Sequence, residues 1–419
     1  MMKILWITNI PLPESTALLT GKGDLKASGG WLLGAASALV ENKDIDLYVA
    51  SLSHAVSEVT VLKGSKITHY LLPIGKGNLK YNKTYESYWK QINKKINPDL
   101  VHIHGTEYTH GLAYVNACGS DNVVVSIQGM KSAYYYYYYY GLSTWDIIKN
   151  ITLRDLIKGT IFDGKKKFRY TAKYEVELIS KVHHIIGRTS WDRARTWAIN
   201  PESNYHFCNE TLRDEFYEGI TWNYGTCLKH SIFVSQAGYP IKGLHQLLKA
   251  MPLILRHYPD AKIRVAGSDI TNSKGIWGLK HFTGYGRIVK SMIKQYGLEH
   301  HIEFTGPLNA TDMRREYLCA NVFVCPSTIE NSPNSLGEAQ ILGVPCLSSY
   351  VGGAMDMMDG NECNLYRFEE IEMLAYKVCS IFKNEENQIS MVNVAQCRHN
   401  RKTNSNQLYS VYMQMLDRK

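Results

Sequence analysis

Short apolar runs that alternate with helical stretches are the feature of this sequence that most constrains its fold. Such runs lie at residues 3–8, 46–51, 66–72, 100–104, 123–128, 184–187, 230–236, 261–268 and 321–326. Runs of this kind are typical of strands in a parallel sheet that helices cover on both faces. In open sheets of this type, ligands bind beyond the carboxyl ends of the strands. The sequence therefore predicts an α/β fold, and polar residues at strand ends become candidate site residues.

The length of the chain predicts more than one such unit. At 419 residues the chain is too long for a typical single domain and suits two domains of roughly 200 residues each. A hydrophobic content of 45% and a charged content of 20% are those of a globular protein with a substantial core.

Charge and cysteine content restrict the partners and the compartment. The net charge of +9 suits anionic ligands such as nucleotide diphosphates, or an anionic membrane surface, but ordinary solubility charge explains it equally well. The nine cysteines include no CxxC pair, so neither zinc nor redox chemistry is indicated, and a reducing cytoplasm is the simplest expectation. The first residues have too short an apolar core for a signal peptide, and no stretch approaches the roughly 20 apolar residues that span a membrane.

A polar loop between a strand and a helix, in the stretch PSTIENSPNSLGEAQILG, is the strongest candidate for a ligand site. Ser332 and Pro333 predict the helix start, as a capping residue followed by a proline in the first helical position. Glu330 then lies in the loop, and Glu338 lies in the first turns of the helix. Such a helix start can receive a phosphate, and carboxylates beside it can accept hydrogen bonds from sugar hydroxyls. Together these parts suit a sugar nucleotide.

Both carboxylates also have a simpler explanation. Ser335 and Glu338 have the spacing of a capping box, so Glu338 could serve only the helix. Glu330 is compatible with an ordinary solvated loop residue. From this stretch alone, the structural and the ligand-binding interpretations are equally supported.

Three features of the first half are further candidates. Gly29 and Gly30 precede an amphipathic helix after the first strand, as at the opening of a Rossmann-like unit, although two glycines can also begin an ordinary helix. Gln128 follows the strand-like run VVVSI. Arg188 ends the strand at 184–187 beside a helix start, where it could bind an anion or pair with Asp192.

The stretch that begins with the two glutamates and continues as AQILGVPCLSSYVGG resembles the donor-site signature of retaining glycosyltransferases of family 4, the glycosyl transferases group 1. In that signature seven residues separate two glutamates, as they separate Glu330 from Glu338. The strings GRTSWDRA and HFCNETLRDEFY are similar to stretches of bacterial capsular and exopolysaccharide glycosyltransferases. The resemblance covers most of the chain. It implies the GT-B fold, in which two Rossmann-like domains with parallel sheets face each other across a cleft.

The resemblance also implies a division of the chain. We expect an acceptor domain at residues 1–205 and a nucleotide-sugar donor domain at residues 206–390. Residues 391–419 would form a final helix that packs back on the first domain.

Each candidate residue receives a role from the same resemblance. Glu330 would contact the hydroxyls of the transferred sugar, Glu338 the ribose hydroxyls, and the pair Lys242–Gly243 the donor diphosphate. A cation at a helix start is unfavourable unless an anion shares the site, which agrees with a phosphate at Lys242. The remaining donor-binding residues would be Gly29, Gly30, Arg188, Gly306, Asn334, Ser335 and Leu336.

We expect Glu330, Lys242 and Gln128 to be the catalytic residues. Lys242 and the helix N-terminus would stabilise the leaving diphosphate, so we expect neither a metal nor a cofactor. Two positions depart from the family pattern. Gln128 stands where many members have a histidine, and Ala237 stands where an arginine is usual, so that Arg188 or another basic residue would have to replace it.

Seven consecutive tyrosines at 134–140 follow neither helical nor strand periodicity. They predict either a loop or helix edge at the cleft mouth or a membrane interface, or a low-complexity run without a role. The basic stretch GKKKFRY, with Lys165–Lys167, is either a solvated helix face or a contact to anionic lipid, where each cation contributes roughly 1 kcal/mol. Nucleic acid is not an expected partner, since no recognised binding motif is present.

Together these features predict a retaining glycosyltransferase of the hexosyltransferase type. It would move a sugar from a UDP- or GDP-sugar to a saccharide or lipid-linked saccharide in bacterial surface polysaccharide synthesis, in the cytoplasm or peripherally on the inner face of the cell membrane. Two alternatives are an epimerase of sugar nucleotides with the same fold and an inactive, sugar-nucleotide-binding partner subunit. Ala237 and Gln128 support the inactive subunit, whereas Glu330, Glu338 and Lys242 argue against it.

Overall fold

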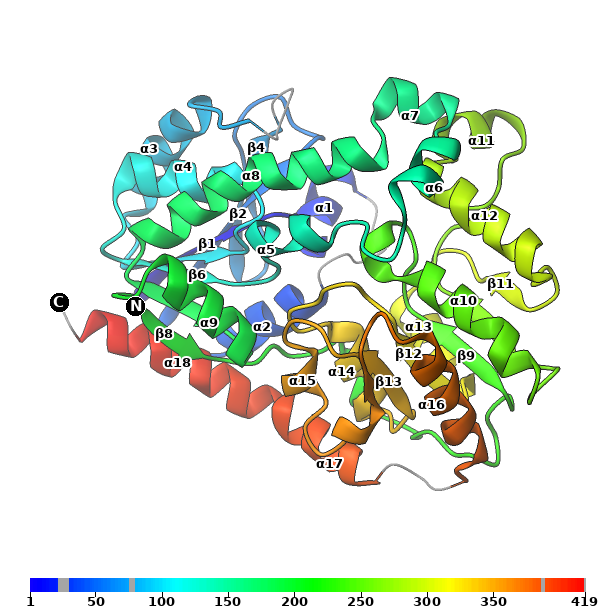
Figure 1. The fold of residues 1–419 in the computed structure, drawn as a ribbon. Helices are drawn as coiled ribbons and strands as arrows, with labels where there is room; N and C mark the ends of the chain where they lie inside the picture. Colours follow the sequence, from blue (N-terminus) through cyan, green and yellow to red (C-terminus); the bar gives the residue numbers. More distant parts are fainter. Residues whose placement is uncertain (22–29, 75–79, 386–388, 418–419) are drawn as a thin grey trace. The chain divides into compact units, whose positions relative to one another are not determined.

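Contacts divide the chain into two compact units, which Figure 1 shows in a computed structural model. The structure describes residues 1–21, 30–74, 80–385 and 389–417. The first unit comprises Met1–Ser132, Phe168–Arg213 and His399–Lys419, and the second comprises Ala133–Lys167 and Asp214–Arg398.

The first unit is built on an eight-stranded sheet in the order β3-β4-β2-β1-β5-β6-β7-β8. Its central strand β1 (Met2–Thr8) pairs in parallel with β2 (Ile45–Ser53) and β5 (Leu100–His104). Among the described strand pairs of this sheet, only β3 with β4 is antiparallel. The remaining strands are β3 (Thr60–Lys63), β4 (Ile67–Pro73), β6 (Val123–Ser126), β7 (His184–Gly187) and β8 (Asn204–Phe207).

The last helix of the chain, α18 (Arg401–Leu416), belongs to this first unit and closes its core. Tyr412 is fully buried, and its hydroxyl lies 3.0 Å from Trp6 Nε1 and 2.6 Å from His102 Nδ1. Leu408 and Val411 pack in the same apolar cluster as Leu32, Ala36 and Leu39 of α2. The other helices of the unit include α1 (Pro13–Thr20), α2 (Gly30–Leu39), α3 (Thr84–Ile96), α4 (Thr109–Cys118) and α9 (Ser190–Ile199).

The second unit is built on a six-stranded sheet in the order β11-β10-β9-β12-β13-β14, and its described strand pairs are all parallel. The strands are short, and β9, β12 and β13 are buried along their whole length. They are β9 (Ser231–Val234), β10 (Lys262–Val265), β11 (Ile302–Phe304), β12 (Val322–Cys325), β13 (Cys346–Ser349) and β14 (Leu365–Tyr366).

Helices of the second unit bury the faces that their periodicity predicts. In α10 (Leu244–Leu255), Leu247, Leu248 and Met251 are fully buried in the main apolar cluster of the unit. The other helices are α11 (Gly275–His281), α12 (Gly284–Tyr296), α13 (Ala310–Cys319), α14 (Asn334–Ile341), α15 (Ala354–Met357), α16 (Ile371–Lys383) and α17 (Ile389–Arg398).

The segment Ala133–Lys167 groups with the second unit, although it precedes β7 and β8 of the first unit in the sequence. It contains α6 (Thr144–Lys149), α7 (Leu153–Lys158) and the first residues of α8 (Ile161–Lys181). The division by contacts thus differs from the expected domain boundaries in this segment. It also differs near the C-terminus of the chain, where α17 stays with the second unit and α18 joins the first.

The tyrosine run begins at the end of α5 (Lys131–Tyr134) and continues through a 3₁₀ turn. Tyr139 packs against the apolar core of the second unit, and the carbonyl oxygen of Tyr140 accepts a hydrogen bond from His245 Nε2 at 2.9 Å. The side chains of Tyr136 and Tyr140 are exposed. The run therefore anchors its segment to the second unit through part of its residues. Within the described parts of the chain, no helix combines the length and the apolar character needed to cross a membrane.

Candidate functional site

The centre of the candidate site is an ion pair between Lys242 and Glu330 in the second unit. Lys242 Nζ lies 2.7 Å from Glu330 Oε1, and both side chains are largely buried. The same carboxylate oxygen accepts a hydrogen bond from Ser327 Oγ at 2.8 Å. Lys242 ends the 3₁₀ turn before α10, and Glu330 lies in the loop after β12, so two loops that follow neighbouring strands meet here.

Gly243 allows these two loops to approach each other. Its φ is +70°, a left-handed conformation that favours glycine, and a Cβ at this position would lie 1.7 Å from the carbonyl oxygen of Pro326. The amide of Thr328 donates to the carbonyl oxygen of Ile241 at 2.7 Å, which joins the backbones of the two loops. The glycine that the sequence paired with Lys242 thus holds the lysine against the glutamate loop.

The electrostatics of Lys242 follow from this pairing. Burial lowers the pKa of a lysine, but the charge of Glu330 and its hydrogen bond outweigh burial and raise the pKa of Lys242 above its ordinary value. Lys242 is therefore a fixed cation at neutral pH. Its ammonium has three N–H groups, of which one is directed at Glu330.

Helix α14 starts one residue later than the sequence predicts. It begins at Asn334, and Pro333 is its N-cap, so the expected placement of Pro333 in the first helical position was wrong. The N-cap residue Pro333 makes no side-chain cap, and the hydroxyl of Ser332 donates to the sulfur of Met357. The capping box that Ser335 and Glu338 could have formed is therefore not the arrangement at this helix start.

The predicted contacts in α14 lie on its first two turns. Glu338 is buried, with 6% of its surface exposed, and Leu336 is fully buried. Asn334 and Ser335 are the first two residues of the helix, where the positive end of its dipole lies. The loop and helix place Glu330, the helix start and Glu338 in one short stretch of the second unit.

Gly306 lies just beyond the carboxyl end of β11, next to Gly267, which follows β10. The two glycines form a backbone bridge in which the Gly267 amide donates to the Gly306 carbonyl oxygen at 3.0 Å. Both have positive φ, and a Cβ at either position would meet no atom within 4 Å. This strand end therefore presents bare backbone with open space beside it.

Two predicted residues, Gln128 and Arg188, come together in the first unit with a residue that the sequence did not single out. The Arg188 guanidinium forms an ion pair with Glu210 at 2.5 Å and donates to Gln128 Oε1 at 3.3 Å. Gln128 Nε2 donates to Glu210 Oε1 at 2.6 Å, which closes the cluster. Asp192 instead caps α9 together with Thr189. The sequence left open whether Arg188 pairs with Asp192. The structure shows that its guanidinium pairs with Glu210 instead.

The remaining predictions fall outside these contacts. Gly30 is the first residue of α2, and Gly29 lies outside the described residues. Ala237 is buried in the core of the second unit. In the part of the chain that the structure describes, no group of three or more His, Cys, Asp or Glu residues is arranged to hold a metal ion.

Sequence reasoning missed Ser327 and Glu210. Ser327 lies three residues before Glu330, and a hydroxyl at that spacing in a turn is a recognisable local partner for a carboxylate. Glu210 is separated from Gln128 by 82 residues, so no local pattern reveals their contact.

Comparison with known proteins finds a family model that matches part of the second unit. Residues 229–398 match the family model described as "Glycosyl transferases group 1". Among curated proteins, the chain is 30% identical over 130 residues to an uncharacterized glycosyltransferase, MJ1607, of Methanocaldococcus jannaschii, over 31% of this chain and 29% of that protein. It is 32% identical over 107 residues to the O-antigen biosynthesis glycosyltransferase WbnH of Escherichia coli, over 26% of this chain and 30% of that protein. The chain thus matches about three tenths of the length of these relatives.

Solved structures show the fold. Sucrose-phosphate synthase from Thermosynechococcus elongatus is similar over 100% of both chains, with a TM-score of 0.68 and 14% identity. WaaG, a glycosyltransferase involved in lipopolysaccharide biosynthesis, is similar over 100% of this chain and 99% of its own, with a TM-score of 0.59 and 13% identity. The predicted GT-B class, with two parallel-sheet α/β units, is confirmed, and residues 229–398 match the model of the glycosyl transferases group 1 family.

Proposed function

We propose that this chain, in which residues 229–398 match the glycosyl transferases group 1 model, transfers a hexosyl group from a nucleotide diphosphate sugar to a saccharide acceptor with retention of anomeric configuration. The observation that carries the proposal is the buried contact between Lys242 and Glu330, at 2.7 Å, four residues before the start of α14 at Asn334. The cation and the helix start suit the diphosphate of such a donor, and the carboxylate suits the hydroxyls of its sugar.

Lys242 would bind the diphosphate. One of its N–H groups is directed at Glu330, and the other two can donate to phosphate oxygens without breaking that pair. The N-terminus of α14 supplies backbone N–H groups and the positive end of a helix dipole to the same anion. The pair would therefore be a preformed receptor in which Glu330 fixes the position of the cation before the donor arrives.

The two carboxylates would recognise the neutral parts of the donor. Glu330 lies next to the proposed phosphate position and would accept hydrogen bonds from hydroxyls of the transferred sugar. Glu338 lies about one turn into α14 and would accept them from the ribose hydroxyls. The bare backbone at Gly267 and Gly306 offers the nucleoside a surface without side chains.

These groups suit the charge that develops during transfer. Cleavage of the bond between the sugar and the diphosphate places negative charge on the leaving oxygens and positive charge on the anomeric carbon. Lys242 and the helix start stabilise the leaving diphosphate, while the carboxylate of Glu330 lies near the sugar. We assign no covalent nucleophile. A leaving phosphate oxygen would take the proton of the acceptor hydroxyl as that hydroxyl attacks the same face.

The acceptor is inferred from the relatives alone. WbnH is named for O-antigen biosynthesis, and WaaG is described as involved in lipopolysaccharide biosynthesis. We propose a saccharide acceptor, free or lipid-linked, of a bacterial surface polysaccharide, and a reaction in the cytoplasm at or near the inner face of the membrane. Gln128 and Arg188 of the first unit stay candidates for contacts to the transferred sugar and the donor.

Substitution of Glu330 tests the proposal directly. Glu330→Ala removes both the partner of Lys242 and the proposed sugar contact, and should lower kcat/KM for transfer by about 100-fold or more, as loss of one preorganised polar contact in other active sites does. Glu303→Ala is a matched control, because Glu303 is also ion-paired in this unit but lies on an exposed strand position, paired with Arg264. Transfer that survives Glu330→Ala and Glu303→Ala equally would refute the site.

The nucleoside is identified by thermal unfolding with UDP, GDP and ADP. A ligand at about 100 times its dissociation constant stabilises by roughly 2.7 kcal/mol, which is readily measured. We expect one nucleotide to raise the unfolding temperature and Glu338→Ala to weaken that shift. No shift with any nucleotide would contradict a preformed donor site. Product analysis without acceptor then separates a transferase from an epimerase, which would convert the donor alone.

A further inference from the structure

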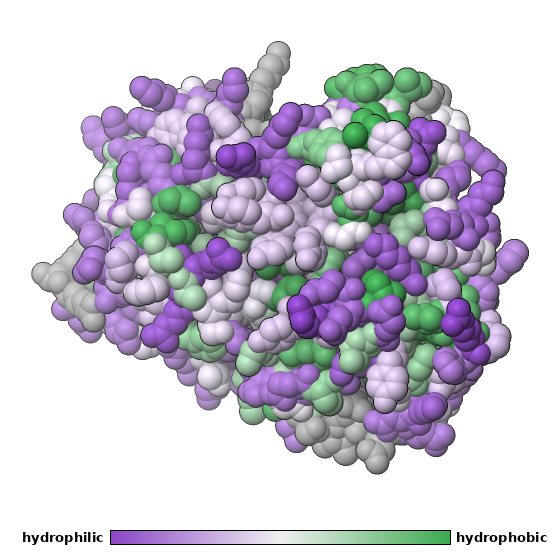
Figure 2. Space-filling model, viewed as in Figure 1, coloured by the Kyte–Doolittle hydropathy of each residue, from purple (hydrophilic) through white to green (hydrophobic). Residues whose placement is uncertain are grey.

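Five apolar side chains of the helices α6 and α7 are exposed on the surface of the second unit. Leu153, Leu156 and Ile157 of α7 are 71%, 71% and 83% exposed, and Trp145 and Ile148 of α6 are 60% and 46% exposed. Figure 2 shows a hydrophobic patch where Figure 1 places α7, with hydrophilic side chains around it. In α7 the three residues have the spacing of one helix face, so they point the same way.

The two helices are fixed so that this face points away from the unit. Each begins with a capping box, formed by Ser143 with Asp146 and by Thr152 with Asp155. The opposite face of α6 carries Ile147, which is buried in the core of the unit. The capping boxes and the buried Ile147 therefore hold the two helices in an orientation that leaves the apolar side chains exposed.

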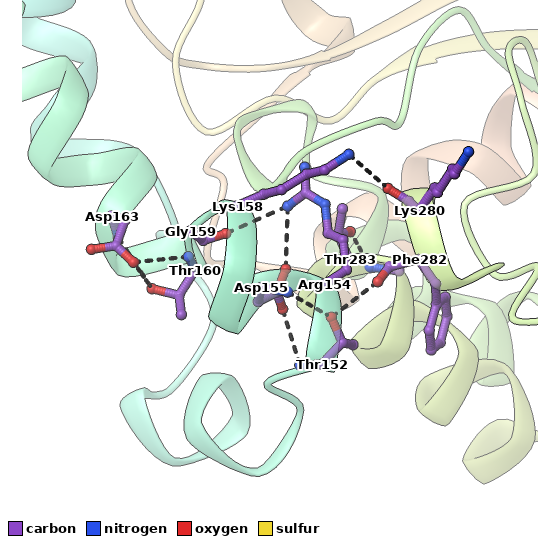
Figure 3. Close-up of polar contacts among 11 residues, drawn as sticks. Thr152, Arg154, Asp155, Lys158, Gly159, Thr160, Asp163, Lys280, Phe282 and Thr283 are labelled. Atoms are coloured by element: carbon purple, nitrogen blue, oxygen red, sulfur yellow. Dashed lines mark hydrogen bonds and ion pairs between the residues drawn. The ribbon is translucent and has the colours of Figure 1, made fainter. Parts of the chain in front are cut away.

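Further contacts seat α7 on the elements behind it, as Figure 3 shows. Thr152 Oγ1 donates to the carbonyl oxygen of Phe282 at 3.0 Å, and Arg287 donates to the carbonyl oxygen of Ile151 at 3.2 Å. Asp155 is buried, and a Cβ on Gly284 would lie 2.6 Å from its carboxylate, so the two segments are in close contact. The apolar face is thus held outward by polar contacts on the other side of α7.

The charge around the patch is positive. Residues 143–167 contain six cations, Lys149, Arg154, Lys158, Lys165, Lys166 and Lys167, and three carboxylates. Each of the three carboxylates, Asp146, Asp155 and Asp163, accepts a hydrogen bond from the backbone amide three positions earlier, and Asp155 is also paired with Arg154, so the remaining cations outnumber the carboxylates. Lys158 Nζ donates to the carbonyl oxygen of Lys280 at 3.4 Å, which holds this cation at the end of α7.

We propose that the surface of α6 and α7 inserts into the interface of an anionic lipid bilayer, with its apolar side chains among the acyl chains and its cations at the headgroups. Trp145 and Lys149 suit this depth, since Lys149 Nζ lies 5.0 Å from the indole centroid and both side chains have an apolar and a polar part. Two short helices that lie on the surface need no membrane-spanning segment.

The charge pattern favours an anionic bilayer over a second copy of the chain as the partner of this surface. Face-to-face contact of two such patches would bring Lys149 and Lys158 of one copy against the same cations of the other, and like charges at short range repel. An anionic surface instead gains from each cation that approaches it. Because the inference concerns this surface and not the sugar site, vesicle binding can be tested independently of sugar transfer.

Sedimentation with vesicles tests the inference. We expect the full chain to pellet with vesicles that contain phosphatidylglycerol, and far less with vesicles of phosphatidylcholine alone. The triple variant Leu153→Ser, Leu156→Ser, Ile157→Ser should bind at least about 100-fold more weakly, because it removes three large apolar side chains from the interface. The double variant Lys149→Gln, Lys158→Gln should weaken binding to the anionic vesicles at low salt. At high salt it should change binding little, because salt screens the attraction between these cations and the headgroups.

A matched control uses exposed apolar residues elsewhere in the unit. Ile220, Leu228 and Tyr376 are 73%, 52% and 69% exposed, and their triple substitution by serine should leave vesicle binding unchanged. Equal unfolding temperatures would show that each variant is folded. Failure of the wild type to pellet with anionic vesicles, or equal loss in both triple variants, would overturn the inference. A dimer that the α7 variant dissociates, without vesicle binding, would assign the surface to a second copy instead.

Discussion

Substitution of Gly243 by alanine isolates the contact that holds the candidate site together. Two costs combine at this position. A non-glycine residue in the left-handed conformation, here with φ of +70°, costs roughly 1–2 kcal/mol. The new Cβ would also start 1.7 Å from the carbonyl oxygen of Pro326, so the two backbones would have to separate by more than an ångström. Overpacking of this kind typically costs about 1–3 kcal/mol more.

Gly297 provides the matched control for the conformational part of this cost. It ends α12 in the same unit with φ of +65°, and a Cβ there would meet no atom within 4 Å. Gly297→Ala should therefore show the backbone cost alone. Gly243→Ala should lower the free energy of unfolding by about 1–3 kcal/mol beyond the control, the part that overpacking contributes.

Thermal unfolding of the second unit measures the difference. For a unit of this size, each kcal/mol corresponds to roughly 2–4 °C, so Gly243→Ala should unfold about 2–12 °C below Gly297→Ala. Gly243→Ala should also weaken the stabilisation by nucleotide, because separation of the loops moves Lys242 away from Glu330. Equal shifts for both variants would refute the argument that close packing against Pro326 positions the lysine.

Two further perturbations test the packing of each unit. Tyr412→Phe leaves Trp6 Nε1 and His102 Nδ1 without the hydroxyl that contacts them. It should lower the free energy of unfolding in urea by about 2–4 kcal/mol. A loss below about 0.5 kcal/mol would show that α18 does not depend on these contacts. Burial lowers the pKa of His245 to about 3, so its stabilising effect is complete above the unfolded pKa of about 6.5 and is lost as pH falls toward 3. We expect the free energy of unfolding of the wild type to fall below pH 6.5, and His245 to contribute up to about 1.4 kcal/mol per pH unit to this slope. His245→Gln keeps a donor for the carbonyl oxygen of Tyr140 and should reduce the slope. An unchanged slope would contradict a buried neutral histidine.

The predicted strands and the helix faces agree with the structure where local pattern alone determines them. The apolar run at 230–236 contains β9, and the periodicity of the following residues places Leu247, Leu248 and Met251 in the core. The start of α14 shows the limit of such patterns. Ser332 and Pro333 have the composition of a helix start, but the chain enters the helix one residue later, and Ser332 contacts Met357 instead. Competition between a local cap and a tertiary partner decided the boundary.

The candidate site was predictable as a set of residues and not as an arrangement. Glu330, Glu338, Lys242 and Gly243 stand out in the sequence, but the pairing of Lys242 with Glu330 joins positions 88 residues apart. Likewise, the partner of Arg188 is Glu210, whereas its sequence neighbour Asp192 caps the following helix. Carboxylates near an arginine in sequence have local uses that compete with ion pairing, and only the folded chain shows which use prevails.

The sequence by itself determined the parallel α/β units and the loop that holds the two glutamates, because strands, helices and turns follow from patterns within about ten residues. The tertiary structure decided that residues 133–167 join the second unit, that Lys242 meets Glu330 and that the apolar side chains of α7 face outward. Each of these depends on contacts between segments far apart in the chain, such as Tyr140 with His245 and Thr152 with Phe282. A local pattern states that a side chain is apolar or charged, but the path of the whole chain determines what it contacts.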